Sequence, residues 1–146
     1  MLEIRTEIEI NASAGRVWSV LTDFAGHPAW NPFVRRIEGM PKAGERLTVW
    51  IQPPGGKGMR FRPIVLEATS EQELRWLGRV LLPGMFDGEH YFRIVPVGED
   101  KVRFIHGERF SGVLVGLLKS SLETGTRAGF EAMNRALKAR AEAGQG

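Results

Sequence analysis

In the segment FDGEHYFRIVPVGEDKVRFIHGERF, residues 86–110, two alternating runs flank one polar turn, and this pattern is the main evidence for the fold. Alternation of apolar and polar residues over Phe86–Val95 and again over Val102–Phe110 predicts two half-buried strands. The segment Val97–Lys101 between them carries the glycine and acidic residues of a hairpin loop. We therefore expect an antiparallel hairpin here, with its register set by that loop.

The expected register predicts which side chains of the hairpin share a face. Counting back from the loop places Phe92 opposite His106 and His90 opposite Glu108, and directly opposite residues point to the same side of a sheet. Two histidines and one carboxylate thus lie on an otherwise apolar face, where leaving them unpaired is costly. That face carries Phe86, His90, Phe92, Ile94, Phe104, His106, Glu108 and Phe110. The opposite face carries Glu89, Arg93, Arg103 and Arg109, which belong in water.

The chain before this hairpin predicts one strand, one helix and then a series of strands. Residues 2–10 alternate strictly, and Asn11 or Ser13 can cap a helix that carries apolar residues as far as Phe24. Consecutive strands without intervening helices form a meander, so we expect an antiparallel sheet. Pro63 marks an edge or a bulge within one of these strands. The further strands are predicted at 33–38, 47–52, 59–68 and 73–79.

The C-terminal part predicts a long helix, because apolar residues recur at helical spacing from Leu114 to Leu137. Gly125 and Gly129 lie near its apolar face, and each costs up to about 1 kcal/mol inside a helix. Close approach of the helix to the sheet is the expected compensation. A curved sheet around one helix rarely fills the space between them, which predicts a pocket lined from both sides. Residues 141–146 are expected to fray.

The composition predicts one soluble domain over residues 1–146. Hydrophobic residues make up 42% and charged residues 25%, as in ordinary globular proteins, and no cysteine is present for disulfides or thiolate chemistry. The 20 basic and 17 acidic residues are dispersed, whereas a nucleic-acid binder gathers its basic groups, so no nucleic-acid partner is expected. The chain shows neither a signal-like start nor an apolar run of membrane-spanning length, so we expect a cytoplasmic protein.

Four stretches resemble those of the START-like superfamily and its helix-grip fold. They are NASAGRVWSVLTDF at residues 11–24, WNPFV at 30–34, LRWLG at 74–78 and ERFSG at 108–112. Within the superfamily the chain is similar to the polyketide cyclase/dehydrase and lipid-transport (SRPBCC) group. This resemblance implies an α+β fold with a curved seven-stranded antiparallel sheet wrapped around a long C-terminal helix. It also implies two short helices after the first strand and an internal apolar cavity, but it transfers no catalytic motif.

The candidate catalytic residues are His90, His106 and Glu108. The functional interpretation makes His90 and Glu108 an acid/base pair, or polar hooks that orient a ligand. The structural interpretation is a satisfied internal hydrogen bond at the end of the sheet. The two histidines can approach each other diagonally, but no third ligand accompanies them, so we expect no metal site. Nucleotide-binding glycine motifs and a nucleophile elbow are absent from the sequence, and no cofactor is expected.

The expected wall of the cavity combines inward-facing strand residues with the apolar face of the C-terminal helix. Trp30 and Phe33 are included on the family resemblance more than on spacing. The candidate ligand-binding residues are Trp30, Phe33, Val49, Ile51, Phe61, Trp76, Phe86, Phe92, Ile94, Phe104, Phe110, Leu118, Leu122 and Phe130.

Three functions remain open on the sequence alone. The first is binding of a small hydrophobic ligand, lipid- or polyketide-like, in the cavity. The second is a polyketide cyclase/dehydratase-type enzyme that uses His90 and Glu108 as acid and base, and the third is a co-chaperone-like interaction module. The apolar segments Leu81–Phe86 and Val113–Leu118 predict a mobile portal, a homodimer contact or plain local packing.

Overall fold

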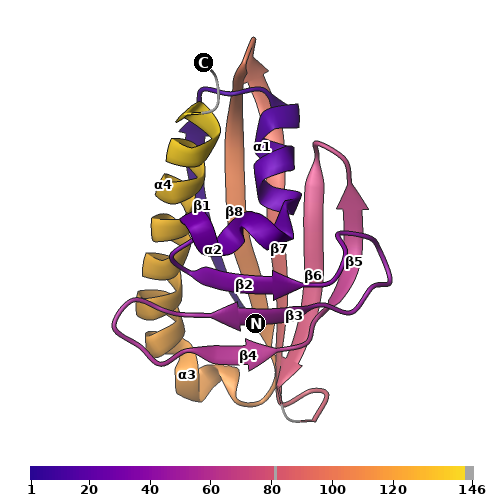
Figure 1. Cartoon of the computed structure of the whole chain (residues 1–146). Coiled ribbons are helices and arrows are strands. Elements are labelled where there is room, and N and C mark those ends of the chain that lie inside the picture. Colours follow the sequence, from indigo (N-terminus) through magenta and orange to yellow (C-terminus); the bar gives the residue numbers. More distant parts are fainter. Residues whose placement is uncertain (81, 144–146) are drawn as a thin grey trace.

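Eight strands form two antiparallel sheets in a computed structural model that describes residues 1–80 and 82–143 (Figure 1). The larger sheet has the order β1-β8-β7-β6-β5, and the smaller has the order β2-β3-β4. The larger sheet consists of β1 (Leu2–Ile10), β5 (Ile64–Thr69), β6 (Glu73–Val80), β7 (Phe86–Gly98) and β8 (Lys101–Ser111). The smaller consists of β2 (Val34–Glu38), β3 (Thr48–Ile51) and β4 (Met59–Phe61). The helices are α1 (Ala14–Thr22), α2 (His27–Trp30), α3 (Val115–Ser121) and α4 (Arg127–Ala143).

The expected single sheet of seven strands is wrong, because the chain changes partner at Pro63. The predicted strand 59–68 divides there into β4, which pairs with β3, and β5, which pairs with β6. Proline has no N–H to donate to a ladder, so it interrupts the strand. Its carbonyl oxygen still accepts from the Leu47 N–H at 2.8 Å, and a bridge between Arg46 and Ile64 joins the two sheets.

The predicted register of the β7–β8 hairpin is confirmed. Phe92 pairs with His106 and His90 pairs with Glu108. The turn is tighter than expected, because β7 continues to Gly98 and β8 begins at Lys101. The register shift between Pro96 and Gly98 absorbs the extra residue.

The helices α1, α2 and α4 and the three-stranded sheet lie over one face of the larger sheet (Figure 1). Strands β2–β4 run across the strands of that sheet, and α4 packs against β1 and β8. Helix α1 begins where Ser13 caps it, since the Ser13 side chain accepts from the Arg16 N–H at 3.1 Å. Its buried residues Val17, Val20 and Leu21 face the interior.

The predicted C-terminal helix is interrupted by a π-helical segment, Leu122–Thr126, between α3 and α4. Gly125 lies in this segment, and a methyl group there would meet open space. A methyl group at Gly129 would overlap the ring of Phe33, the residue before β2. The part of the molecule that approaches the helix closely at Gly129 is therefore Phe33, and not the larger sheet as expected. Helix α4 runs to Ala143 and Ala141 is buried, and fraying of the tail from residue 141 stays a prediction. Residues 144–146 of that expected tail lie outside the described residues.

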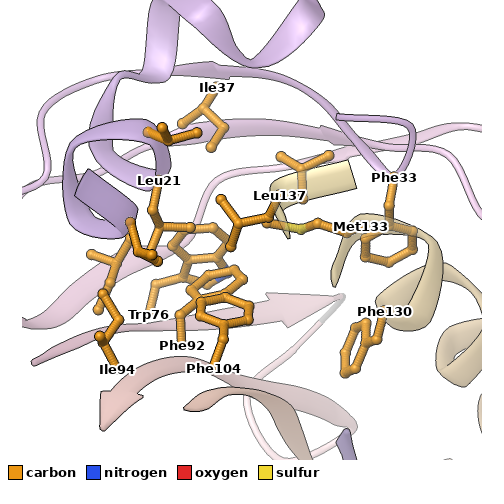
Figure 2. Close-up of a cluster of buried hydrophobic side chains, with 14 of the residues drawn as sticks. Leu21, Phe33, Ile37, Trp76, Phe92, Ile94, Phe104, Phe130, Met133 and Leu137 are labelled. Carbon is orange, nitrogen blue, oxygen red and sulfur yellow. The ribbon is translucent and has the colours of Figure 1, made fainter. Parts of the chain in front are cut away.

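The space between α4 and the middle of the larger sheet is occupied by packed side chains (Figure 2). Met133 and Leu137 come from α4 and meet Trp76, Phe92 and Phe104 of the sheet. These residues are buried, and Leu21 and Ile37 close the cluster from α1 and β2. The interior is therefore filled along this part of the helix, and the expected cavity is not found there.

Candidate functional site

A pocket of about 380 Å³ opens where the ends of β6, β7 and β8 meet α3 and the smaller sheet. Seven of the predicted wall residues line it, and apolar groups dominate the lining. The predicted members are Phe33, Ile51, Phe61, Phe86, Phe110, Leu118 and Leu122, together with the predicted catalytic residue Glu108. The lining residues not predicted are Pro53, Met59, Gly78, Val80, Gly88, Leu114, Ser121 and Thr126.

The other seven predicted wall residues do not line this pocket. Six of them, Val49, Trp76, Phe92, Ile94, Phe104 and Phe130, are buried and belong to the hydrophobic core. Trp30 packs on His27 with ring centroids 4.8 Å apart and lines a separate groove with Arg16 and Arg140. Strand alternation indicates the inner face but not the position along it where space remains.

The corner that carries Phe33 into the pocket wall is held by the buried Asn31. Its Oδ1 accepts from the backbone N–H groups of Phe33 and Val34, each at 2.9 Å. Its Nδ2 lies 3.0 Å from His27 Nδ1, and His27 Nε2 donates to the Leu21 carbonyl at 2.7 Å. Burial lowers the pKa of His27 below its usual value near 6.5. The neutral ring therefore supports this turn as a structural group.

Glu108 is the one ionisable side chain among the described residues that line the pocket. Its side chain is 15% exposed, and its carboxyl lies over Gly88 on the neighbouring strand. A side chain at Gly88 would occupy the position of Glu108 Oε2, so the glycine leaves room for the carboxyl. Gly88 is thus a site residue that sequence reasoning missed.

Glu108 is the outer end of a polar chain that runs inward through His90, His106 and Asn134 to Thr6. His90 Nδ1 lies 3.3 Å from Glu108 Oε1, and the Nε2 atoms of the two histidines lie 2.8 Å apart. His106 Nδ1 is 2.9 Å from Asn134 Oδ1, and Asn134 Nδ2 donates to Thr6 Oγ1 at 2.8 Å. The Thr6 hydroxyl donates to the His106 carbonyl at 2.9 Å.

His106 lies too deep to touch a ligand in the pocket. It is fully buried and stacks on Phe130 with ring centroids 3.9 Å apart. Burial is the main cause that lowers its pKa well below 6.5, and the charge of a protonated His90 acts in the same direction. Hydrogen bonds to Asn134 and to the Phe130 backbone oppose this shift without reversing it. His106 is therefore a neutral positioning group.

The structure brings the three predicted catalytic residues together but gives them different places. Glu108 borders the pocket, His90 lies directly behind it with 1% of its side chain exposed, and His106 follows at the greatest depth. Asn134 and Thr6 were missed, although each is a polar residue on an apolar face. Asn134 follows Met133 on the buried side of α4, and Thr6 stands among the inward residues of β1.

The two apolar segments expected at an interface expose several side chains. Val113 is 77% exposed and Leu117 is 84% exposed, and Leu82 is exposed as well, as is Met59, which lines the pocket. Leu81 of the first segment lies outside the described residues. Contact between two copies of the chain through these segments remains a prediction.

Within residues 1–80 and 82–143, no three His, Asp or Glu side chains gather closely enough to hold a metal ion. None of the helices in these ranges is both long and apolar enough to cross a membrane.

An antiparallel sheet folded against a long C-terminal helix, with an apolar pocket at one end, defines the helix-grip class of α+β proteins. The sequence model of the family described as polyketide cyclase/dehydrase and lipid transport matches residues 1–142. The chain belongs to this family, as the resemblance in its four sequence stretches predicted. No curated protein sequence matches the chain closely enough to count as a relative.

Several solved structures share the fold of this chain. A START superfamily protein from Mycobacterium smegmatis is 20% identical with a TM-score of 0.77, and the match covers 97% of each chain. A Thermus thermophilus protein is 20% identical with a TM-score of 0.77, covering 99% of this chain and 100% of that one. Norcoclaurine synthase from Thalictrum flavum, solved with a transition-state analogue, is 18% identical with a TM-score of 0.76, covering 99% and 96%.

Proposed function

We propose that the protein binds a small hydrophobic ligand, lipid- or polyketide-like, in the pocket beneath α3. The observation that carries the proposal is a pocket of about 380 Å³ whose lining is apolar except for one carboxyl group and two hydroxyl groups. Pockets of this size, mostly apolar with a few placed polar groups, are typical of small-molecule sites. Family membership supports the same conclusion.

The experiment blocks the pocket and measures uptake of the neutral fluorescent probe N-phenyl-1-naphthylamine. Ser121 lines the pocket, whereas its neighbour Ser120 on α3 does not. Ser121→Trp should fill the pocket and abolish probe binding, and the matched control Ser120→Trp should bind like the unaltered protein. Equal binding by both variants would place the ligand elsewhere. Native mass spectrometry followed by denaturing extraction then identifies any compound that co-purifies.

The position of Glu108 favours a second candidate, an enzyme of the cyclase/dehydratase type. A carboxyl group at the pocket wall, backed by His90 at 3.3 Å, is placed to exchange a proton with a bound compound. In such an enzyme, Glu108→Gln should remove turnover and retain binding of the extracted compound. In a pure carrier, the same variant should change affinity alone.

A further inference from the structure

We infer that His27 is a positioning residue for the pocket. Its neutral ring holds Phe33 in the pocket wall, and a proton added to that ring releases Phe33 and weakens ligand binding. The inference rests on the proposed function, because it names how binding in the same pocket is regulated. It follows from the hydrogen bonds of the Asn31 amide and from the direction in which Phe33 is free to move.

The backbone fixes the orientation of the Asn31 side chain. Its Oδ1 accepts from the N–H groups of Phe33 and Val34, each at 2.9 Å, so its NH₂ group points the other way. That NH₂ group lies 3.0 Å from His27 Nδ1 and can only donate to it. The Leu21 carbonyl, 2.7 Å from His27 Nε2, requires a hydrogen on that second nitrogen. His27 Nδ1 therefore has to be an acceptor without a hydrogen of its own.

A second hydrogen on the His27 ring would break this arrangement. It would lie on Nδ1 and face the hydrogens of the Asn31 NH₂ group. If the amide turned over, its oxygen could accept from Nδ1, but its NH₂ group would then face the N–H groups of Phe33 and Val34. Asn31 is fully buried, so bulk water cannot take the place of the lost partners. The amide can satisfy either the protonated ring or the turn before β2, but not both.

The surroundings of His27 keep its ring neutral at pH 7. Burial is the main cause that lowers its pKa below 6.5, while the hydrogen bond to Leu21 and the negative charge of Asp23 act in the opposite direction. The ring is 1% exposed, so protonation occurs within the packed structure. The charged side chains that the neighbouring elements bring to this region are Arg35 of β2, which donates to the Asn31 carbonyl at 2.7 Å, and Arg16 of α1 and Arg140 of α4, which line the groove beside Trp30 with Asp23.

Phe33 transmits the change because it lies between α4 and the pocket. Its ring meets Phe130 edge-on with centroids 5.6 Å apart, and a methyl group at Gly129 would overlap it, so the helix blocks movement to that side (Figure 2). On its other side Phe33 lines the pocket, where space is free. Once its hydrogen bond to Asn31 is lost, the ring moves toward the pocket and reduces the volume left for a ligand.

The experiment measures the affinity for N-phenyl-1-naphthylamine at half-unit steps from pH 7.5 to pH 4.5, while NMR follows the titration of the His27 ring. The affinity should be constant above the midpoint of that titration and should fall below it by up to about tenfold per pH unit. Bound probe should move the midpoint to lower pH, because coupling between two binding events is reciprocal. Circular dichroism at each pH checks that the protein stays folded.

Three variants separate this role from a purely structural one. His27→Gln has no ring to protonate, so its affinity should be independent of pH. Asn31→Asp supplies a carboxylate that accepts from the N–H groups of Phe33 and Val34 and from a protonated His27 at the same time, so it should keep its affinity at pH 5. Glu108→Gln removes the carboxyl group of the pocket wall and should retain the pH dependence of the unaltered protein.

Constant affinity across the midpoint of His27 would overturn the inference and leave the proposed function standing, because the probe still binds. The same pH dependence in His27→Gln would assign the effect to another group, and an equal loss at pH 5 in Asn31→Asp would contradict the role of the amide. If the probe binds at no pH, the proposed function and the inference fail together. Nitrogen-15 NMR at pH 7 tests the geometry without a ligand: a ring hydrogen on His27 Nε2 is expected, and one on Nδ1 would refute the inference.

Discussion

Lowering the pH from 7 to 5 should destabilise the protein through its buried neutral histidines. Burial lowers the pKa of His106 well below 6.5, and burial also lowers the pKa of His27. In the unfolded chain both side chains take up a proton near pH 6.5, while in the folded protein they stay neutral to lower pH. Because the unfolded state then binds more protons, the free energy of unfolding is highest above about pH 6.5 and falls below it.

The magnitude follows from the difference in bound protons. Each histidine that stays neutral when folded costs about 1.4 kcal/mol per pH unit below its unfolded pKa, which gives about 2 kcal/mol at pH 5. This amount is the upper limit for each histidine, and His106 should contribute the larger share because its pKa is lowered more strongly than that of His27. Glu3 and Glu73 do not contribute in this range, because their pKa values are lowered from 4.5 and their effect begins below that pH.

The assay is guanidinium unfolding at half-unit steps from pH 7.5 to pH 5, with the free energy of unfolding plotted against pH. His27→Asn should reduce the slope by its own contribution, and His106→Gln should reduce it more. Since His106→Gln removes a member of the polar chain and can impair folding, the titration of His106 in the unaltered protein is followed by NMR as well. A flat stability profile, or protonation of His106 near pH 6.5 in the folded protein, would refute the reasoning.

Two further predictions concern the substitution of glycines by alanine. Gly129→Ala should destabilise the protein by about 1–3 kcal/mol, because the new methyl group overlaps the Phe33 ring in a packed interior. Gly125→Ala, which meets open space, should be neutral or slightly stabilising in the same denaturation assay, and equal effects would contradict the packing argument. Gly88→Ala should displace the Glu108 carboxyl and change the affinity for N-phenyl-1-naphthylamine at unchanged fold, as judged by circular dichroism. An unaltered affinity would show that the position of this carboxyl does not affect the bound probe.

Several parts of the fold could be predicted because they depend on neighbours along the chain. Alternation over residues 86–110 and a loop expected at Val97–Lys101 predicted the pairing of His90 with Glu108. The turn itself is shorter, and the register shift between Pro96 and Gly98 preserves that pairing. The cap at Ser13 and the apolar periodicity of the C-terminal helix are local in the same sense. The sequence predicted only part of the change of strand partner at Pro63. Proline marks an interruption, but the next partner depends on strands distant in the sequence.

Alternation along the strands predicted which side chains point inward, because a two-residue period assigns every strand position to one face. Alternation could not predict which part of that face is covered by packed side chains. That depends on the side chains that α1, α4 and the smaller sheet place against the larger sheet. Phe92 and Phe110 both point inward, yet one packs beneath α4 and the other borders the pocket. The polar contacts around His106 likewise depend on the tertiary structure, because Asn134 and Thr6 meet His106 only when α4 packs against β1 and β8.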